Sequence, residues 1–394
     1  MNAFISKSSK NYYIAILALF FGSLATFGLE YCVQPILPAI SEEFSVSPSV
    51  ASITMSIGLA GMSIAMFLIA TFADKLKRKL TMSIALTVAA ILAIIMSVSI
   101  DLKLIWVLRF TQGLLLAGFP ALAVAYIHEE FAPDITGKIV GIYVSGTSIG
   151  GFLGRAVTSA LTDVFNWRVG LCIIGISYLI IAVIFFMSLP KEKNHISKNI
   201  NQINFLEEFK KIFTNGRLVT LYFVGFACLG SLVCIYNYIS YLLMVHPYNL
   251  SQTIIGLLFF GYLFGIISAA IMGDLADKHG KGQILCLGII LFLIGTIITL
   301  STILWLKILG LVILTMGFFG SHSVACSWVG KCYDGDKARA VSLYMLFYYF
   351  GASIIGTVGG IFFTSHGWLG LTAFVSIILA TSLVLVFRYR HDPS

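Results

Sequence analysis

Three charged residues lie inside long apolar stretches of this sequence. Glu30 follows "FGSLATFGL", Arg109 lies within "IWVLRFTQG", and Arg155 lies within "GGFLGRAVTSAL". A charge in the interior of a bilayer costs several kcal/mol by conservative scales, so each side chain needs a partner or a water-filled cavity. A carboxylate in such a place can take up a proton, and an arginine can bind a carboxylate or an anionic substrate. The three residues predict a polar site inside a membrane protein.

All three residues are expected at a similar depth. Counted from the inner end of its apolar stretch, Arg155 is about 17 residues along, or roughly 26 Å at the helical rise. Glu30 and Arg109 are each about 18 residues along their own stretches on the same count. We expect Arg155 to face inward and to pair with Glu30 or to bind an anionic substrate. A purely structural buried pair and an arginine that reaches out to the interface are the alternatives.

Several other polar residues in apolar stretches are candidates for the same cavity. They are Gln34, Gln112, Tyr236, Asn237, Tyr241 and His322. Histidine has an ordinary pKa near 6.5, so His322 is a possible proton carrier. A histidine that only packs between helices is an equal alternative. The polar tips of the tyrosines and of Asn237 need partners in lipid, which favours positions along a cavity.

The elements that carry these residues are apolar helices. The chain of 394 residues is 59% hydrophobic and 11% charged, whereas soluble domains have about 25% charged residues. Apolar stretches of about 20 residues, long enough to cross a bilayer, recur throughout. The sequence predicts an all-α membrane protein with twelve spans. These are 12–37, 50–72, 80–99, 104–127, 138–162, 168–189, 217–244, 252–272, 284–302, 305–330, 338–362 and 367–387.

The basic residues are distributed unevenly between the two sides of this arrangement. With the N-terminus inside, 20 of the 25 Lys and Arg residues fall on the inner side. Only Lys103, Arg168 and Lys307 fall outside. The positive-inside rule therefore predicts that both termini are cytoplasmic. The formal charge of +8 reflects this topology, so no nucleic-acid partner is expected.

The two halves of the chain resemble each other. "FADKLKRK" at 72–79 matches "LADKHGKG" at 275–282, and "GTSIGGFLGR" at 146–155 matches "GASIIGTVGG" at 351–360. The repeat predicts two pseudo-symmetric six-helix bundles. Their expected bounds are 1–189 and 217–394.

Between the bundles, residues 190–216 form the only long polar connection. The linker contains "FLEEFKKIF", whose apolar residues recur at helical spacing. This pattern predicts a short amphipathic helix on the inner membrane surface. A solvated linker is the alternative.

Two halves of six spans, a cytoplasmic middle loop and a D-K-x-x-(R/K) loop resemble the major facilitator superfamily. The resemblance is strongest to inner-membrane proteins of its bacterial drug:proton antiporter branch. It implies a cytoplasmic gate at Asp74, Lys75 and Arg78, repeated at Asp277 and Lys278. An acidic side chain there can meet a helix N-terminus and nearby basic groups in one conformation. The alternative is that these loops are basic for topology alone.

Two further motifs are similar to those of the family. "RFTQG" matches R-x-x-Q-G through Arg109 and Gln112, and the resemblance implies that Arg109 takes part in proton coupling. "GTSIGG" matches the antiporter motif G-P-x-x-G-G, with Thr147 in place of the proline. The missing proline weakens the implication of antiport, but the small residues permit close helix packing in lipid.

The sequence therefore predicts a secondary active transporter of the inner membrane that works by alternating access. Proton-coupled export of a small organic solute or drug is the expected activity. Uptake or exchange of an anionic metabolite is the alternative, and a non-transporting sensor is a weaker one. No enzyme or ATP-binding motif is present, and no cofactor or metal is expected. The expected partners are a small-molecule substrate, protons and the lipid bilayer, and the chain is expected to be a monomer.

Overall fold

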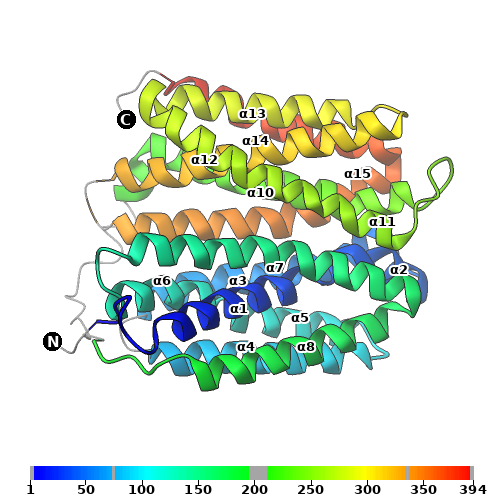
Figure 1. Cartoon of the computed structure of the whole chain (residues 1–394). Coiled ribbons are helices and arrows are strands. Elements are labelled where there is room, and N and C mark those ends of the chain that lie inside the picture. The colour runs from blue at the N-terminus through cyan, green and yellow to red at the C-terminus, as the bar shows by residue number, and fades with distance from the viewer. Residues whose placement is uncertain (1–3, 73–75, 195–210, 334, 336, 391–394) are drawn as a thin grey trace. The chain divides into compact units, whose positions relative to one another are not determined.

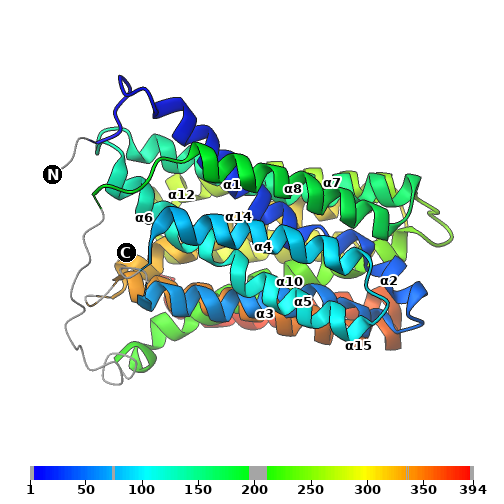
Figure 2. The ribbon, with the colours of Figure 1, turned by 90° about the horizontal axis from the view of Figure 1, so that it is seen from below.

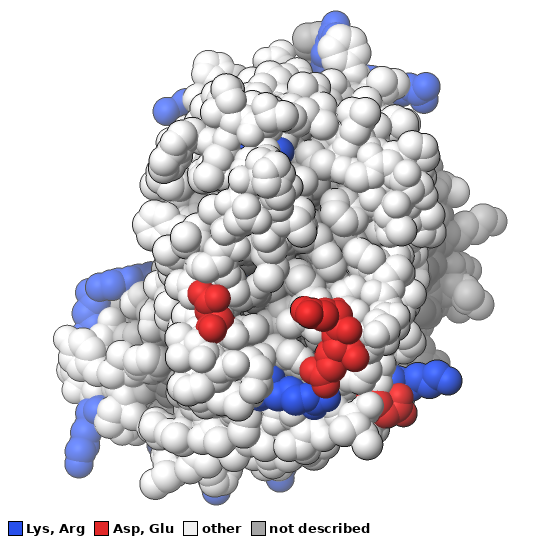
Figure 3. Space-filling view, turned by 90° about the vertical axis from the view of Figure 1, so that its right-hand side faces the viewer, with Lys and Arg blue, Asp and Glu red and all other residues white. Residues whose placement is uncertain are grey.

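The computed structural model describes residues 4–72, 76–194, 211–333, 335 and 337–390. These residues are almost entirely helical, as Figures 1 and 2 show. Backbone N–H and C=O groups find no water in lipid, and a helix satisfies them within one segment. Figure 3 views the molecule along the helices from one end, where few Lys, Arg, Asp and Glu side chains are visible among the described residues.

The chain divides into two compact units. The first comprises Met1–Ile36 and Ile57–Asn199, and the second comprises Leu37–Ser56 and Ile200–Ser394. Leu37–Ser56 thus groups with the second unit, although it precedes most of the first in sequence. The bundle bounds expected from the repeat remain a prediction. Most of the expected amphipathic linker helix lies outside the described residues.

Among the described residues, the first unit consists of six helices, one short turn and most of a seventh helix. They are α1 (Tyr12–Tyr31), η1 (Gln34–Ile36), α3 (Pro48–Phe72) from Ile57 onwards, α4 (Arg78–Ser97), α5 (Leu102–Leu116), α6 (Gly118–Glu130), α7 (Thr136–Val164) and α8 (Trp167–Ser188). The closest packed pairs are α1 with α7 and α4 with α8. Asn166 caps α8 by accepting a hydrogen bond from the backbone N–H of Val169 at 2.9 Å, which fixes where that helix begins.

The second unit contains the remaining elements. They are α2 (Leu37–Glu43), the start of α3, α10 (Gly216–Leu243), α11 (Gln252–Leu257), η3 (Leu258–Phe260), α12 (Gly261–His279), α13 (Lys281–Ile298), α14 (Leu304–Lys331) and α15 (Lys337–Phe387). Here α10 packs on α15, and α14 packs on α12 and α13. Under the sequence repeat, α10 and α15 correspond to α1 and α7, so equivalent helices pair in both units.

The number of spans agrees with the sequence. In the described part of the chain, ten helices are long and apolar enough to cross a membrane. One of them, α15, contains two helices joined at His366 and Gly367, where Gly367 has φ of 60°. The glycine-rich α7, with 29 residues, is not among the ten and adds another span. The predicted all-α architecture of twelve spans is confirmed.

Glycines bring α7 against α1. A Cβ added at Gly146, Gly150 or Gly154 would lie 2.6, 2.2 or 2.5 Å from a backbone carbonyl oxygen of α1. The three glycines are spaced four residues apart and therefore share one helix face. Only glycine permits this approach, and it fixes the height of Arg155 on α7 relative to Glu30 on α1.

Candidate functional site

The centre of the candidate site is a contact between α1 and α5 in the first unit. Glu30 and Arg109 are both fully buried. Nη2 of Arg109 lies 3.4 Å from Oε1 of Glu30 and donates to the Glu30 backbone carbonyl at 2.8 Å. Nη1 also donates to the carbonyl of Leu29 at 3.3 Å. Arg109 therefore joins the end of α1 to α5 through both charge and backbone hydrogen bonds.

Gln112 also holds Arg109 in place. Its Oε1 accepts a hydrogen bond from Nη1 of Arg109, and its Nε2 donates to the carbonyl of Ala89 on α4 at 2.8 Å. The R-x-x-Q spacing puts both side chains on one face of α5. Gly58 on α3 makes room for the guanidinium, because a Cβ there would lie 2.7 Å from Nη2. The role of Gly58 was not predicted, because its only signal in the sequence is a glycine within an apolar stretch.

The carboxylate of Glu30 is only partly satisfied. Its Oε1 faces Arg109, whereas Oε2 is buried and has no hydrogen-bond partner among the described residues. Buried polar atoms in native proteins nearly always have a partner, so an orphaned one calls for an explanation. A donor group of a bound solute can supply the missing hydrogen bond, whereas a proton on Oε2 removes the negative charge that makes its absence costly.

Arg155 makes a second buried cluster nearby in the same unit. Its Nε donates to Oε1 of Gln34 at 2.6 Å, and its Nη1 donates to the carbonyl of Gly151 at 2.8 Å. The guanidinium lies 3.9 Å from the centre of the Tyr31 ring. Stacking of this kind is worth up to about 2 kcal/mol when the cation is desolvated. Arg155 is held by Gln34 and Tyr31, which both follow Glu30 closely in the chain.

Among the described residues, Glu30 forms its ion pair with Arg109 and not with Arg155; the other partner expected for Arg155, an anionic substrate, stays a prediction. The acidic partner lies beside Arg109 instead, while Arg155 acts on Glu30 only as a more distant charge. The reason is local: Gln34 and Tyr31 already surround the guanidinium of Arg155. Arg155 and Arg109 are 1% and 0% exposed, so neither reaches out to the interface.

His322 lies in an aromatic cluster in the second unit. Its Nδ1 is 3.0 Å from the hydroxyl of Tyr344, and its ring stacks on Tyr348 with centroids 4.4 Å apart. Phe318 stacks on His322 and on Tyr348, with ring centroids 6.1 and 6.3 Å apart. Apart from their aromatic character, no sequence pattern indicates that Tyr344 and Tyr348 lie beside His322, because the two tyrosines belong to α15 and His322 belongs to α14.

Of the candidates on α10, Tyr236 and Asn237 are buried and Tyr241 is half-buried, and the two tyrosines have separate contacts. The hydroxyl of Tyr236 lies 2.9 Å from Oγ1 of Thr315, and the hydroxyl of Tyr241 donates to the carbonyl of Leu37 at 2.8 Å. Asn237, which lies between the two tyrosines in the sequence, is fully buried. The two tyrosines therefore tie α10 to different elements of the second unit.

The predicted gate residues are only partly within the described chain. Asp74 and Lys75 lie outside it. Arg78 is 1% exposed and forms a two-pronged ion pair with Glu129, with distances of 2.8 and 3.2 Å. The role of Glu129 was not predicted, since a carboxylate at a helix end also fits a solvated surface.

The second copy of the gate motif is fully described. Asp277 lies 3.7 Å from Nζ of Lys281 and 3.6 Å from Nζ of Lys331, and it is itself 66% exposed. Lys278 is exposed at the end of α12. The acidic residue of this motif thus bridges α12, α13 and α14 within the second unit.

Comparison with known proteins points to one family. The family model described as Major Facilitator Superfamily matches residues 19–246 and 221–394. An uncharacterized transporter of Buchnera aphidicola from Schizaphis graminum is 38% identical over 99% of this chain and 94% of its own. The inner membrane transport protein YnfM of Escherichia coli is 36% identical over the same shares of the two chains.

Solved structures agree on the fold. A bacterial homologue of the human lysosomal transporter Spinster superposes with a TM-score of 0.78 at 15% identity and covers 97% of both chains. The xylose transporter XylE from Escherichia coli gives 0.73 at 15% identity and covers 98% of both chains. The resemblance drawn from the sequence motifs is confirmed.

Proposed function

The chain belongs to the major facilitator superfamily, and we propose that it exports a small organic solute from the cell in exchange for protons. Members of this family are secondary active transporters that work by alternating access, and the chain is a multi-pass protein of the inner membrane. Cytoplasmic termini and a monomeric state are part of the proposal. The observation that carries the proposal is the buried, half-satisfied carboxylate of Glu30.

Glu30 has the surroundings that a proton-coupling site needs. In the ionised form its charge is compensated by Arg109 at 3.4 Å. In the protonated form Arg109 keeps hydrogen bonds to Gln112 and to the carbonyls of Leu29 and Glu30. In that state the charge of Arg109 has no counter-ion, and these hydrogen bonds offset part of the several kcal/mol that such a buried charge costs. A site that tolerates both protonation states can exchange a proton during each transport cycle.

Export of a lipophilic or aromatic solute has support of its own. The chloramphenicol resistance protein CraA of Acinetobacter baumannii is 25% identical over 88% of this chain. In the second unit, His322 stacks with Tyr348 and Phe318, and such rings prefer flat apolar or aromatic partners. We therefore propose that the substrate is an uncharged or weakly charged organic molecule.

Uptake or exchange of an anionic metabolite is the second candidate. Arg109 and Arg155 place two buried guanidinium groups in the first unit against the single carboxylate of Glu30. A guanidinium binds a carboxylate or phosphate with two parallel hydrogen bonds. An organic anion is the solute that such an excess of positive charge favours.

Transport into inside-out membrane vesicles separates the two candidates. With an acidified lumen, vesicles that contain the protein should accumulate radiolabelled chloramphenicol or another member of an organic-solute panel. Glu30→Gln should abolish this accumulation, whereas Glu42→Gln, which changes an exposed carboxylate on α2, should not. Accumulation of organic anions in right-side-out vesicles, without any export in the first assay, would establish the second candidate instead.

A further inference from the structure

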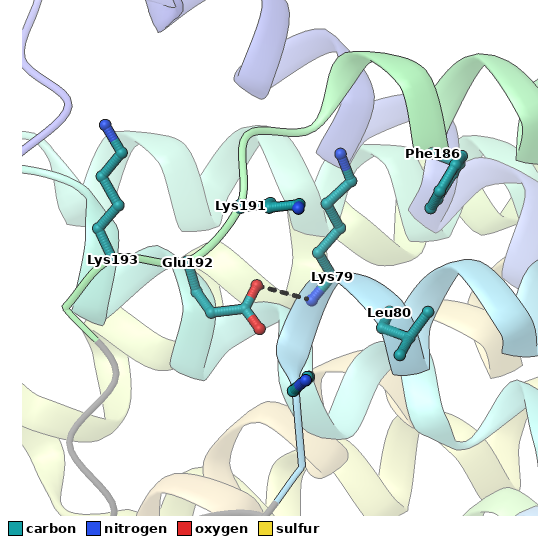
Figure 4. Close-up of a pocket in the computed structure, with 7 residues that line it drawn as sticks. Lys79, Leu80, Phe186, Lys191, Glu192 and Lys193 are labelled. Atoms are coloured by element: carbon teal, nitrogen blue, oxygen red, sulfur yellow. Dashed lines mark hydrogen bonds between the residues drawn. The ribbon is translucent and has the colours of Figure 1, made fainter.

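A lysine-lined pocket lies at one end of the first unit, where α4 begins and α8 has just ended (Figure 4). Its volume is about 600 Å³, and its lining consists of the side chains of seven residues. They are Lys77, Lys79, Leu80, Phe186, Lys191, Glu192 and Lys193. The transport site described above uses none of these residues.

The pocket carries an excess of positive charge. Four of its seven residues are lysines, and Glu192 is the only acidic one. Lys79 lies within electrostatic range of both Lys191 and Glu192. The carboxylate of Glu192 is itself engaged by the backbone N–H of Lys79 at 3.4 Å, as Figure 4 shows. An anion with more than one negative oxygen would relieve the repulsion among the lysines.

The floor and rim of the pocket are apolar and open to the outside. Phe186 and Leu80 are 51% and 47% exposed, in positions near the ends of two membrane-spanning helices. The ammonium group of Lys79 lies 5.2 Å from the centre of the Phe186 ring. A ligand in the pocket thus meets cations and a lipid-facing apolar surface side by side. This combination matches a phosphate group that carries acyl chains.

We propose that this pocket binds the headgroup of an anionic phospholipid. The lysines contact the phosphate oxygens, and the first carbons of the acyl chains lie along Leu80 and Phe186. Basic pockets at the cytoplasmic ends of membrane helices are suited to such headgroups, and each lysine near the surface contributes about 1 kcal/mol. A free phosphate ion shares the headgroup chemistry but gains nothing from the apolar rim.

Lipid binding to the purified full-length protein tests the proposal. Native mass spectrometry in detergent measures the affinity for phosphatidylglycerol, cardiolipin and phosphatidylcholine. The wild type should bind the two anionic lipids more tightly than phosphatidylcholine. Lys79→Gln/Lys191→Gln should weaken the binding of the anionic lipids by roughly tenfold or more. The matched control, Lys138→Gln/Lys337→Gln, removes two exposed lysines from other helices and should bind as the wild type does.

Three results would overturn the proposal. The first is an unchanged lipid affinity in the pocket variant, and the second is equal affinity of the wild type for all three lipids. The third is binding of inorganic phosphate or glycerol 3-phosphate that displaces the lipid at equal concentration, which would assign the pocket to a soluble anion. If the first variant does not fold, Lys77→Gln/Lys193→Gln replaces two exposed lysines of the same pocket and serves the same test.

Discussion

Nη2 of Arg109 lies 3.4 Å from Oε1 of Glu30, and neither side chain has any exposed surface. The two residues are 79 positions apart in the chain and belong to α1 and α5. Because each is the compensating charge of the other, they act as one unit. Their behaviour as a pair decides whether Glu30 is a structural residue or the proton site of the transporter.

Glu30→Gln and Arg109→Gln should each destabilise the protein, because each strands one buried charge. Breaking a buried pair typically costs about 3–5 kcal/mol. The double variant should be milder than the sum of the two, since neither charge is left alone. A double-mutant cycle on the free energy of unfolding in detergent measures this coupling. Additive losses would show that the two side chains do not interact energetically.

Gly150→Ala should destabilise the first unit, because the new Cβ would lie 2.2 Å from a backbone oxygen of α1. We expect a loss of about 1–3 kcal/mol in the free energy of unfolding. Gly141 is the matched control in the same helix, as no atom lies within 4 Å of a Cβ there. Gly141→Ala should be neutral or stabilising by about 0.5–1 kcal/mol. Equal effects at both glycines would contradict the close packing of α7 on α1.

Arg155→Lys should weaken the protein although the charge is kept. Lysine lacks the planar guanidinium that stacks on Tyr31 at 3.9 Å and donates to Gln34 at the same time. The expected loss of unfolding free energy is about 1–2 kcal/mol. Tyr31→Leu should produce a similar loss, and the two changes together should not add. Wild-type stability of Arg155→Lys would mean that only the charge matters at this position.

Asp277→Asn should leave the stability nearly unchanged and slow transport. The carboxylate is 66% exposed, and exposed ion pairs contribute about 0–1 kcal/mol. If the motif is a gate, however, loss of its contacts with Lys281 and Lys331 changes the balance between conformations. Initial transport rates at equal protein level in vesicles measure the effect. Unchanged transport rates would mean that the second copy of the motif is not a gate and only helps to set the orientation of the helices in the membrane.

The helical architecture and the repeat could be predicted from the sequence because both depend on local patterns. Apolar length sets the spans, and the glycines spaced by four in α7 indicate close packing before any partner is known. The R-x-x-Q spacing likewise brings Arg109 and Gln112 onto one helix face. These features require no knowledge of which helices are neighbours.

The pairing of charges across helices could not be predicted in the same way. Glu30, Arg109 and Arg155 were expected at one depth, but depth alone does not say which arginine faces the carboxylate. Lys307 shows the same limit. Its assignment to the outer side of the membrane stays a prediction, and no sequence pattern indicates that it is 2% exposed or that its Nζ donates to the carbonyl of Thr299. The direction in which a side chain points around its helix axis determines both the arginine that pairs with Glu30 and the burial of Lys307. The sequence alone does not reveal this direction.

The most direct test of proton coupling at Glu30 needs no knowledge of the substrate. Proteoliposomes on a solid-supported membrane are given a sudden change of outside pH, and the transient current that follows reports protons binding to the protein. The wild type and Glu42→Gln should both give this current, and Glu30→Gln should give none. A current of wild-type size in Glu30→Gln liposomes, at equal protein content, would place the proton site elsewhere and contradict the proposed mechanism.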